Sequence, residues 1–316
     1  MIRAGLPRIL RSLGVLLVVA ALTCQLAFLM PGDPALILLG QESTEAQRAE
    51  LRHTLGLDQG FFPRFFDWVG GVLTGDWGTS FTSGRPVLTE ILERIPVTLE
   101  LVLLAQLLAL AAIIPLALGS ARRVGGRFDR VVSTATFITL AVPSFVVGVI
   151  LIYLFAVHLG WLPATGYVAF AEDPIQNLRR MILPALTLGI SEAAVYTRAL
   201  RGAAIEAVRA PYAYATMVRG ASDRALMWRR ILRPSSPTLV AMLGITVATA
   251  LGGSLLVEQL FALPGLGRLT VGALGARDLP LIQGVVLFAA IVVVAAGILT
   301  DIALFLIDRR SARGRS

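Results

Sequence analysis

The chain has 316 residues, of which 56% are hydrophobic and only 15% are charged, and its mean hydropathy is +0.78. Soluble domains carry about 25% charged residues, so these values exclude an ordinary soluble protein and indicate long segments in contact with lipid. The net charge of +8 comes with 28 basic residues, all arginines, but they lie in short stretches between apolar runs, which argues against a nucleic-acid partner.

Six apolar runs have about the 20 residues that a helix needs to cross a bilayer. In chain order they cover residues 12–30, 97–119, 131–157, 181–200, 238–257 and 281–307. Helices are expected because lipid offers no hydrogen-bond partner to the backbone, so the predicted fold class is an all-α polytopic membrane protein with six transmembrane helices. A cleaved signal peptide is the alternative for the first run. That run is long and no small-residue cleavage site follows it, so a retained anchor is favoured.

The arginines predict the orientation in the membrane. If the N-terminus is inside, the inner segments are 1–11, 121–130, 198–233 and 308–316, and they hold 19 of the 28 arginines. Basic residues in short loops favour the cytoplasmic side, so both termini are predicted to be cytoplasmic.

The segment 31–95 between the first two runs is too long for a plain connection and holds nine acidic residues. Its part "TEAQRAELRHTLGL" has helical spacing, "FFPRFFDWVGGVL" is typical of an amphipathic helix at a membrane surface, and "GDWGTSFTSGRPV" is rich in turn residues. We therefore expect a small extracytoplasmic subdomain in this segment.

Enzymatic motifs are missing from the sequence. It has no phosphate-binding GxxxxGK[ST] loop, no HExxH, no CxxC and no GxSxG, and "GLG" at 265–267 lacks the setting of a dinucleotide site. Cys24 is the only cysteine, and His53 and His158 are isolated, so no metal site, cofactor or catalytic residue is predicted.

Glu192 is the one ionisable residue deep within an apolar run. Such a charge is costly in lipid, which makes Glu192 a candidate for the translocation path; the alternative is that it bonds to a neighbouring helix. Three prolines also lie within runs and predict either tolerated kinks or hinges: Pro115, Pro143 and Pro184.

The segment 202–235, predicted to be cytoplasmic, is too long for a turn. Its sequence predicts a helix restarting after Pro211, a break at Gly220, and a second short helix "SDRALMWRR" with Ser222 as its N-cap. Such a helix, glycine turn and helix would form a docking surface for a cytoplasmic partner. A basic segment resting on anionic lipid headgroups is the alternative.

This loop resembles the cytoplasmic loop of binding-protein-dependent ABC transporter permeases. The pattern A-x-x-x-x-G from Ala215 to Gly220, followed by "ILRP", carries the resemblance, although Tyr214, Ala215 and Thr216 replace the usual E-A-A and Pro234 follows Arg233. Other stretches resemble the B-type permease of the dipeptide/oligopeptide/nickel branch over nearly the whole chain: "MPGDPALILLG", "LRHTLGLD", "GDWGTSFTSGRPVLTEILERIPVTLEL", "LLVEQLFALPGLGRLTVGALGARDLPLIQGVVL" and "TDIALFLIDRR".

The resemblance implies a permease of the ABC type I importer fold in a bacterial inner membrane. It implies a second homologous permease as heterodimer partner, two cytoplasmic ATP-binding subunits, an extracytoplasmic solute-binding protein and the surrounding lipid. The residues expected to contact the ATPase are Tyr214, Ala215, Arg219, Gly220, Ala221, Asp223 and Arg224. Peptides are the expected solute, with nickel or a glutathione-like solute as alternatives.

The expected organisation is a cytoplasmic N-terminus with the first span (1–30), the subdomain 31–95, a permease core 96–307 that includes the coupling loop 202–235, and a cytoplasmic tail 308–316. Two other classes of protein remain as alternatives. A stand-alone secondary transporter would need paired broken helices in two related halves, and a membrane enzyme would need catalytic residues clustered at one depth; neither pattern is found in the sequence.

Overall fold

The protein is described here by a computed structural model that covers residues 2–29, 36, 39, 43–54, 58 and 60–307. The predicted tail 308–316 and most of 30–42 lie outside the described residues. Within the described part the structure is helical without named strands, apart from one antiparallel bridge between Thr79 and Pro86, and the all-α class is confirmed. The elements, with π-helical turns labelled η, are α1 (Ile2–Leu29), α3 (Glu45–Thr54), α4 (Phe61–Thr74), α5 (Val87–Arg122), α6 (Arg127–Ala141), α7 (Ser144–Leu151), η1 (Ile152–His158), α8 (Pro174–Arg209), α9 (Pro211–Val218), α10 (Asp223–Ala225), η2 (Leu226–Ile231), α11 (Leu232–Leu260), α12 (Leu266–Ala276) and α13 (Leu279–Ile307).

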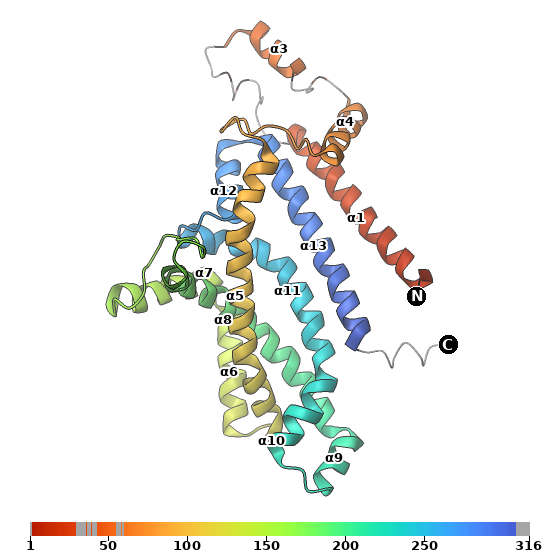
Figure 1. The fold of residues 1–316 in the computed structure, drawn as a ribbon, viewed down its shortest axis with the longest axis vertical. Coiled ribbons are helices and arrows are strands. Elements are labelled where there is room, and N and C mark those ends of the chain that lie inside the picture. The colour runs from red at the N-terminus through yellow and green to blue at the C-terminus, as the bar shows by residue number, and fades with distance from the viewer. Residues whose placement is uncertain are drawn as a thin grey trace. The chain divides into compact units, whose positions relative to one another are not determined.

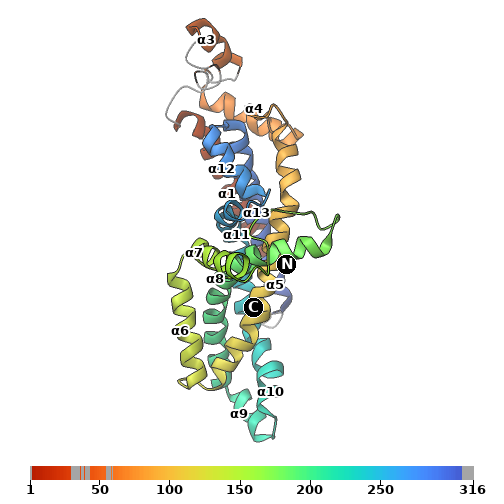
Figure 2. The same cartoon turned by 90° about the vertical axis from the view of Figure 1, so that its left-hand side faces the viewer.

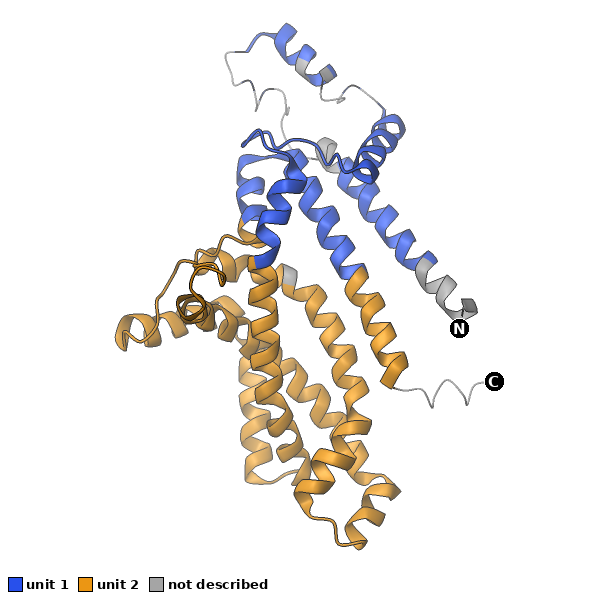
Figure 3. Cartoon of the chain, viewed as in Figure 1, with its two compact units in different colours: residues 1–96, 269–294 blue, residues 97–268, 295–316 orange. Residues whose placement is uncertain are grey.

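The chain divides into two compact units (Figure 3). Unit 1 comprises residues 1–96 and 269–294, and unit 2 comprises residues 97–268 and 295–316.

In unit 1 the segment that precedes α5 is held by the N-cap of α13. The carboxylate of Asp278 accepts a hydrogen bond from the Ser80 hydroxyl at 2.6 Å and another from the Thr82 N–H at 3.0 Å. The turn-rich character expected for "GDWGTSFTSGRPV" is confirmed. Helix α4 is present as predicted and packs against α1, while its Phe62 and Phe66 side chains are exposed.

In unit 2 the long helix α8 is central. It packs against α6, α7 and α11, and Figures 1 and 2 both show α6 running beside it. Buried side chains of α8 such as Tyr196 and Leu200 form an apolar cluster with Ile113 of α5. The absence of a side chain at Gly189 allows close approach, since a Cβ there would lie 2.9 Å from the Ala105 carbonyl oxygen of α5.

The ends of α8 follow from its sequence. Asp173 is its N-cap, accepting hydrogen bonds at 3.0 Å from the N–H groups of Ile175 and Gln176, and Pro174 occupies the first turn, where no N–H is needed. The helix ends at Arg209 because Ala210 precedes a proline and takes an extended conformation. Its 36 residues span about 54 Å.

Three helices are long and apolar enough to cross a membrane, or four if a bent pair counts as one span, among the described residues. The three helices are Val87–Arg122, Asp223–Ala250 and Leu279–Ile307. The bent pair is α6 with α7 and η1, which meet at 103°. The expected runs 12–30 and 181–200 lie in α1 and α8, but the apolar part of α1 is short, Leu10–Gln25, and α8 carries polar residues such as Thr187 and Glu192.

The sharp bend differs from the single span expected over 131–157. Helix α6 ends at Ala141, Val142 is extended, and Pro143 starts the next helix as its N-cap. Proline has no N–H to continue the helical hydrogen bonds and forces the preceding residue out of the helical conformation. Pro143 therefore breaks the helix rather than being tolerated as a mild kink.

Candidate functional site

The loop that joins α8 to α11 begins with a short exposed helix. Pro211 starts α9, and the helix ends at Val218. Helix α9 is labelled in Figure 1. Tyr214 is 71% exposed and Val218 is 70% exposed, so large side chains of this helix face outward. Exposed apolar side chains gathered on one short helix are typical of a surface that contacts another protein.

The turn after α9 depends on Gly220. This residue has φ +77°, a left-handed conformation that glycine adopts without steric cost. Its N–H donates to the Met217 carbonyl at 2.9 Å, and the Ala221 N–H donates to the Thr216 carbonyl at 3.3 Å, so the last carbonyls of the helix are satisfied. A Cβ at Gly220 would meet nothing within 4 Å, so a substitution there would strain the backbone rather than displace neighbours.

The second half of the loop corrects one expectation. Ser222 is the N-cap as predicted and accepts a hydrogen bond from the Ala225 N–H at 3.3 Å. The helix that follows does not end as a separate short helix, because α10 continues through the π turn η2 directly into α11. Pro234 has no N–H to donate to the carbonyl four residues earlier. The π turn, which is wider than an α-helical turn, ends shortly before this proline.

The loop is anchored from beneath by apolar side chains. Eight buried residues of α5, α8 and the loop form one cluster: Leu118, Ala121, Ala204, Ala207, Ala213, Leu226, Met227 and Ile231. Burying a large apolar side chain contributes about 1.5–3 kcal/mol to stability, so the cluster holds the loop firmly against α5 and α8. Movement of the loop should therefore be transmitted to α5 and α8.

Most of the predicted loop residues face solvent. Six of the seven are exposed, namely Tyr214, Ala215, Arg219, Gly220, Asp223 and Arg224, while Ala221 is half-buried. The Asp223 carboxylate also forms an ion pair with Arg122 at the end of α5, a contact that the sequence did not indicate. Both side chains of that pair are about half exposed, so it contributes only about 0–1 kcal/mol.

An ion pair with a buried carboxylate lies near the end of α8, before the loop. The guanidinium of Arg201 donates to both carboxylate oxygens of Asp129 in α6, at 2.6 and 2.8 Å. Arg201 also donates to the Ser120 hydroxyl at 3.0 Å, and the Gly125 N–H donates to Asp129 at 2.7 Å. The pair thus joins the end of α5, α6 and α8 at one point.

A second polar junction connects three helices around Tyr196. Its hydroxyl is fully buried and donates to the Gln106 amide oxygen of α5 at 2.6 Å, and it also contacts the Thr246 hydroxyl of α11. Glu192 lies one turn earlier on α8, half-buried, with one carboxylate oxygen that has no hydrogen-bond partner among the described residues. The sequence pointed to Glu192 alone and missed the junction beside it.

The "GLG" motif also has a structural explanation. The Glu258 carboxylate is fully buried and accepts hydrogen bonds from the Thr98 hydroxyl at 2.8 Å and the Arg268 N–H at 3.0 Å. A Cβ on Gly265 would lie 2.4 Å from that carboxylate. The glycines therefore make room for Glu258, which caps the first turn of α12.

No group of three or more His, Cys, Asp or Glu side chains is placed to hold a metal in the part of the chain that the structure describes. The membrane-length apolar helices indicate an integral membrane protein, and its loop between α8 and α11 is anchored and faces outward.

The comparisons with known proteins identify the family. The model of the binding-protein-dependent transport system inner membrane component matches residues 113–313, and the N-terminal model of the same transport systems matches residues 1–102. The chain belongs to this family of ABC importer permeases, as the loop and the other motifs predicted. It is therefore an integral inner-membrane transport subunit rather than an enzyme, and its family implies ATP-binding and substrate-binding partners.

Relatives match almost the full length of the chain. A Brucella abortus protein named as a peptide transport system permease is 35% identical over 96% of this chain and 97% of its own. The glutathione transport system permease protein GsiC of Salmonella choleraesuis is 34% identical over 96% of each chain. A chain from inward-facing structures of the MetNI methionine ABC transporter aligns with a TM-score of 0.57 and 19% identity, over 69% of this chain and 96% of that chain, and it supports the type I importer fold.

Proposed function

We propose that this chain forms one half of the solute path of an importer for small peptides. In this proposal, the loop between α8 and α11 couples the path to an ATPase. One observation carries the proposal: the loop presents an exposed helix, α9, on a firmly anchored apolar base. A rigidly held loop of this kind can transmit a movement of a bound partner to α5 and α8.

The residues proposed to contact the ATPase are those expected from the sequence. Tyr214 and Ala215 lie on the exposed helix, Gly220 and Ala221 form the turn, and Arg219, Asp223 and Arg224 flank it. Arg219 and Arg224 form no ion pair among the described residues, so both are available to carboxylates of a partner. Asp223 also forms the half-exposed ion pair with Arg122.

The proposed topology has six spans with both termini in the cytoplasm. It includes α1, α8 and the bent pair of α6 and α7 beside the three long apolar helices, because neighbouring helices and a partner permease can cover their polar residues. Residues 1–30 would hold the first anchor, 31–95 the extracytoplasmic subdomain, 96–307 the permease core with the loop 202–235, and 308–316 the cytoplasmic tail.

A second, homologous permease is proposed to complete the path. Glu192 is proposed to face this path, since its carboxylate has an oxygen without a partner among the described residues. The names of the relatives favour peptides as the solute. A glutathione-like solute is the second candidate, on the name of the Salmonella relative, and nickel remains an alternative within the branch.

Orientation can be tested by cysteine labelling in intact cells. A Cys24→Ser background removes the only native thiol, and Thr82→Cys or Tyr214→Cys then adds a single exposed one. An impermeant thiol reagent should label the cysteine at 82 and spare the one at 214. The opposite pattern would reject the proposed topology.

Solute and coupling can be tested in reconstituted vesicles. The permease pair, the ATPases and the binding protein should import a labelled dipeptide or tripeptide only with ATP. Uptake of nickel ions but not of peptides would reject peptides as the solute while leaving the coupling loop intact.

A further inference from the structure

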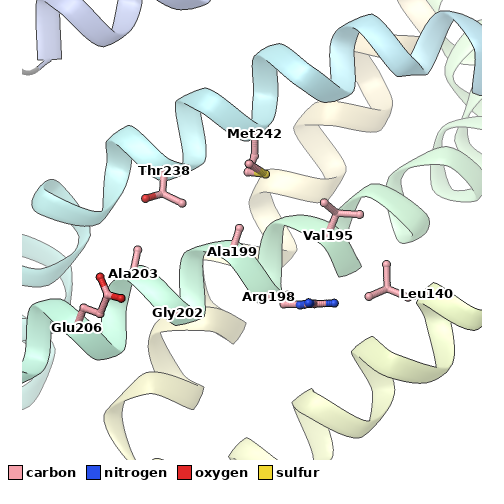
Figure 4. Close-up of a pocket in the computed structure, with 9 residues that line it drawn as sticks. All are labelled: Leu140, Val195, Arg198, Ala199, Gly202, Ala203, Glu206, Thr238 and Met242. Atoms are coloured by element: carbon pink, nitrogen blue, oxygen red, sulfur yellow. The ribbon is translucent and has the colours of Figure 1, made fainter.

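A cavity of about 510 Å³ lies in unit 2 between α6, α8 and α11 (Figure 4). Its volume falls within the roughly 300–1,000 Å³ typical of small-molecule sites. The lining is mostly apolar and is formed by Leu140, Val195, Arg198, Ala199, Gly202, Ala203, Glu206, Thr238 and Met242. Two of these residues carry opposite charges.

The two charged side chains lie at opposite ends of a row of small residues on α8. Figure 4 shows Arg198 and Glu206 separated by Ala199, Gly202 and Ala203. Eight residues along an α-helix correspond to about 12 Å, so the charges are too far apart along the helix to pair with each other directly. The small residues between them leave the wall of the cavity flat and open.

Neither charge is neutralised by another residue that the structure describes. Arg198 and Glu206 are both exposed, and neither forms a hydrogen bond or an ion pair with another residue that the structure describes. Arg201, only three residues from Arg198, is by contrast fully engaged by Asp129. The same helix thus carries one arginine used to hold the fold and one left free in the cavity.

We infer that this cavity is a peptide-binding section at the cytoplasmic end of the path, with Arg198 binding the terminal carboxylate and Glu206 the terminal ammonium group. An extended tripeptide spans about 10–11 Å, which is comparable to the rise of about 12 Å between the two residues along the helix axis. Guanidinium groups bind carboxylates through two hydrogen bonds, and the mostly apolar lining favours peptides with apolar side chains. This inference rests on the proposed function, and it makes the two free ends of the peptide the features that are recognised.

The test compares peptides with free and blocked ends in the reconstituted importer. Uptake of trialanine, its C-terminal amide and its N-acetyl form is measured for wild type, Arg198→Gln and Glu206→Gln. Arg127→Gln is the matched control, because Arg127 is an exposed arginine on α6 outside the cavity. Selectivity of the binding protein is the same for every variant, so the change in an uptake ratio reports on the permease alone.

Arg198→Gln should reduce the ratio of free to amidated peptide uptake about tenfold, as expected for a lost charge-assisted hydrogen bond, and leave the ratio of free to acetylated peptide unchanged. Glu206→Gln should do the reverse. Arg127→Gln should change neither ratio.

Ratios that stay the same in both cavity variants would overturn the inference while wild-type uptake of peptides still supported the proposed function. Loss of the second permease on co-purification with either variant would also overturn it, because the cavity would then be part of the contact between subunits. A wild-type importer that carries none of the three peptides would reject the peptide solute itself.

Discussion

Arg201 and Asp129 form a two-fold hydrogen-bonded ion pair in which the carboxylate is almost completely buried. Removing one partner of such a pair leaves an uncompensated charge and costs about 3–5 kcal/mol. We expect Arg201→Gln to lower the unfolding temperature of the purified protein clearly, whereas Arg198→Gln on the same helix should leave it nearly unchanged. Thermal unfolding in detergent provides the measurement, and equal effects of the two variants would contradict this assignment.

Gly220→Val should weaken coupling without preventing insertion into the membrane. A β-branched residue in a left-handed conformation costs about 1–2 kcal/mol, and the turn would rearrange to avoid it. The expected result is normal amounts of the permease in the membrane, reduced co-purification of the ATPase and reduced uptake. Gly297→Val is the control, because a Cβ there also meets nothing within 4 Å but the residue has no left-handed conformation. Normal ATPase binding by Gly220→Val would contradict the docking role and favour the alternative that the loop rests on lipid headgroups.

Gly267→Ala should destabilise the turn between α11 and α12. A Cβ at this position would lie 2.6 Å from the Leu255 Cα, and backbone atoms cannot move aside as a flexible side chain can. The expected cost is about 1–3 kcal/mol. Gly272→Ala, where the new methyl group would meet nothing within 4 Å, should be neutral or slightly stabilising in the same unfolding measurement.

Asp278 should make unit 1 sensitive to acid. Burial raises the pKa of its carboxyl, but hydrogen bonds from Ser80, Thr82, Phe81 and Leu281 outweigh that effect and hold the pKa below its ordinary value. A depressed pKa in the folded state contributes stability above the ordinary value of 3.8, and that contribution is lost as the pH falls through the folded value.

Asp278→Asn keeps the shape of the side chain and removes the titration. At pH 6 the variant should be less stable than wild type, and this difference should shrink as the pH is lowered below about 4. Unfolding temperatures measured between pH 6 and pH 3 provide the test. A difference that stays constant over this range would show that the hydrogen bonds do not depend on the charge.

Local signals in the sequence predicted some features well. The N-cap at Ser222, the break at Gly220 and the helix Phe61–Thr74 follow from short-range chemistry, and each is present in the structure. The sequence predicts a single span through Pro143, whereas the structure has a sharp bend there. A proline alone does not show whether packing against neighbouring helices keeps the span continuous. The prediction of a separate second short helix was wrong, because a π turn can continue a helix just before a proline.

Long-range partners were beyond the reach of the sequence. Asp129 and Arg201 are 72 positions apart, and Gln106 and Tyr196 are 90 apart, so no periodic pattern connects them. The cavity could not be predicted for the same reason: three helices that are distant in the chain form its walls, and the opposite charges of Arg198 and Glu206 become meaningful only when they share one space.

The continuity of α8 has a mechanical consequence. The part of α8 that follows Pro184 carries Glu192 and the cavity charges, and it ends where the exposed loop begins. A rigid helix that tilts at its loop end also moves the side chains along its length at the same time. In the proposed function, release of the solute would then coincide with the movement of the ATPase, and no other element would be needed between them.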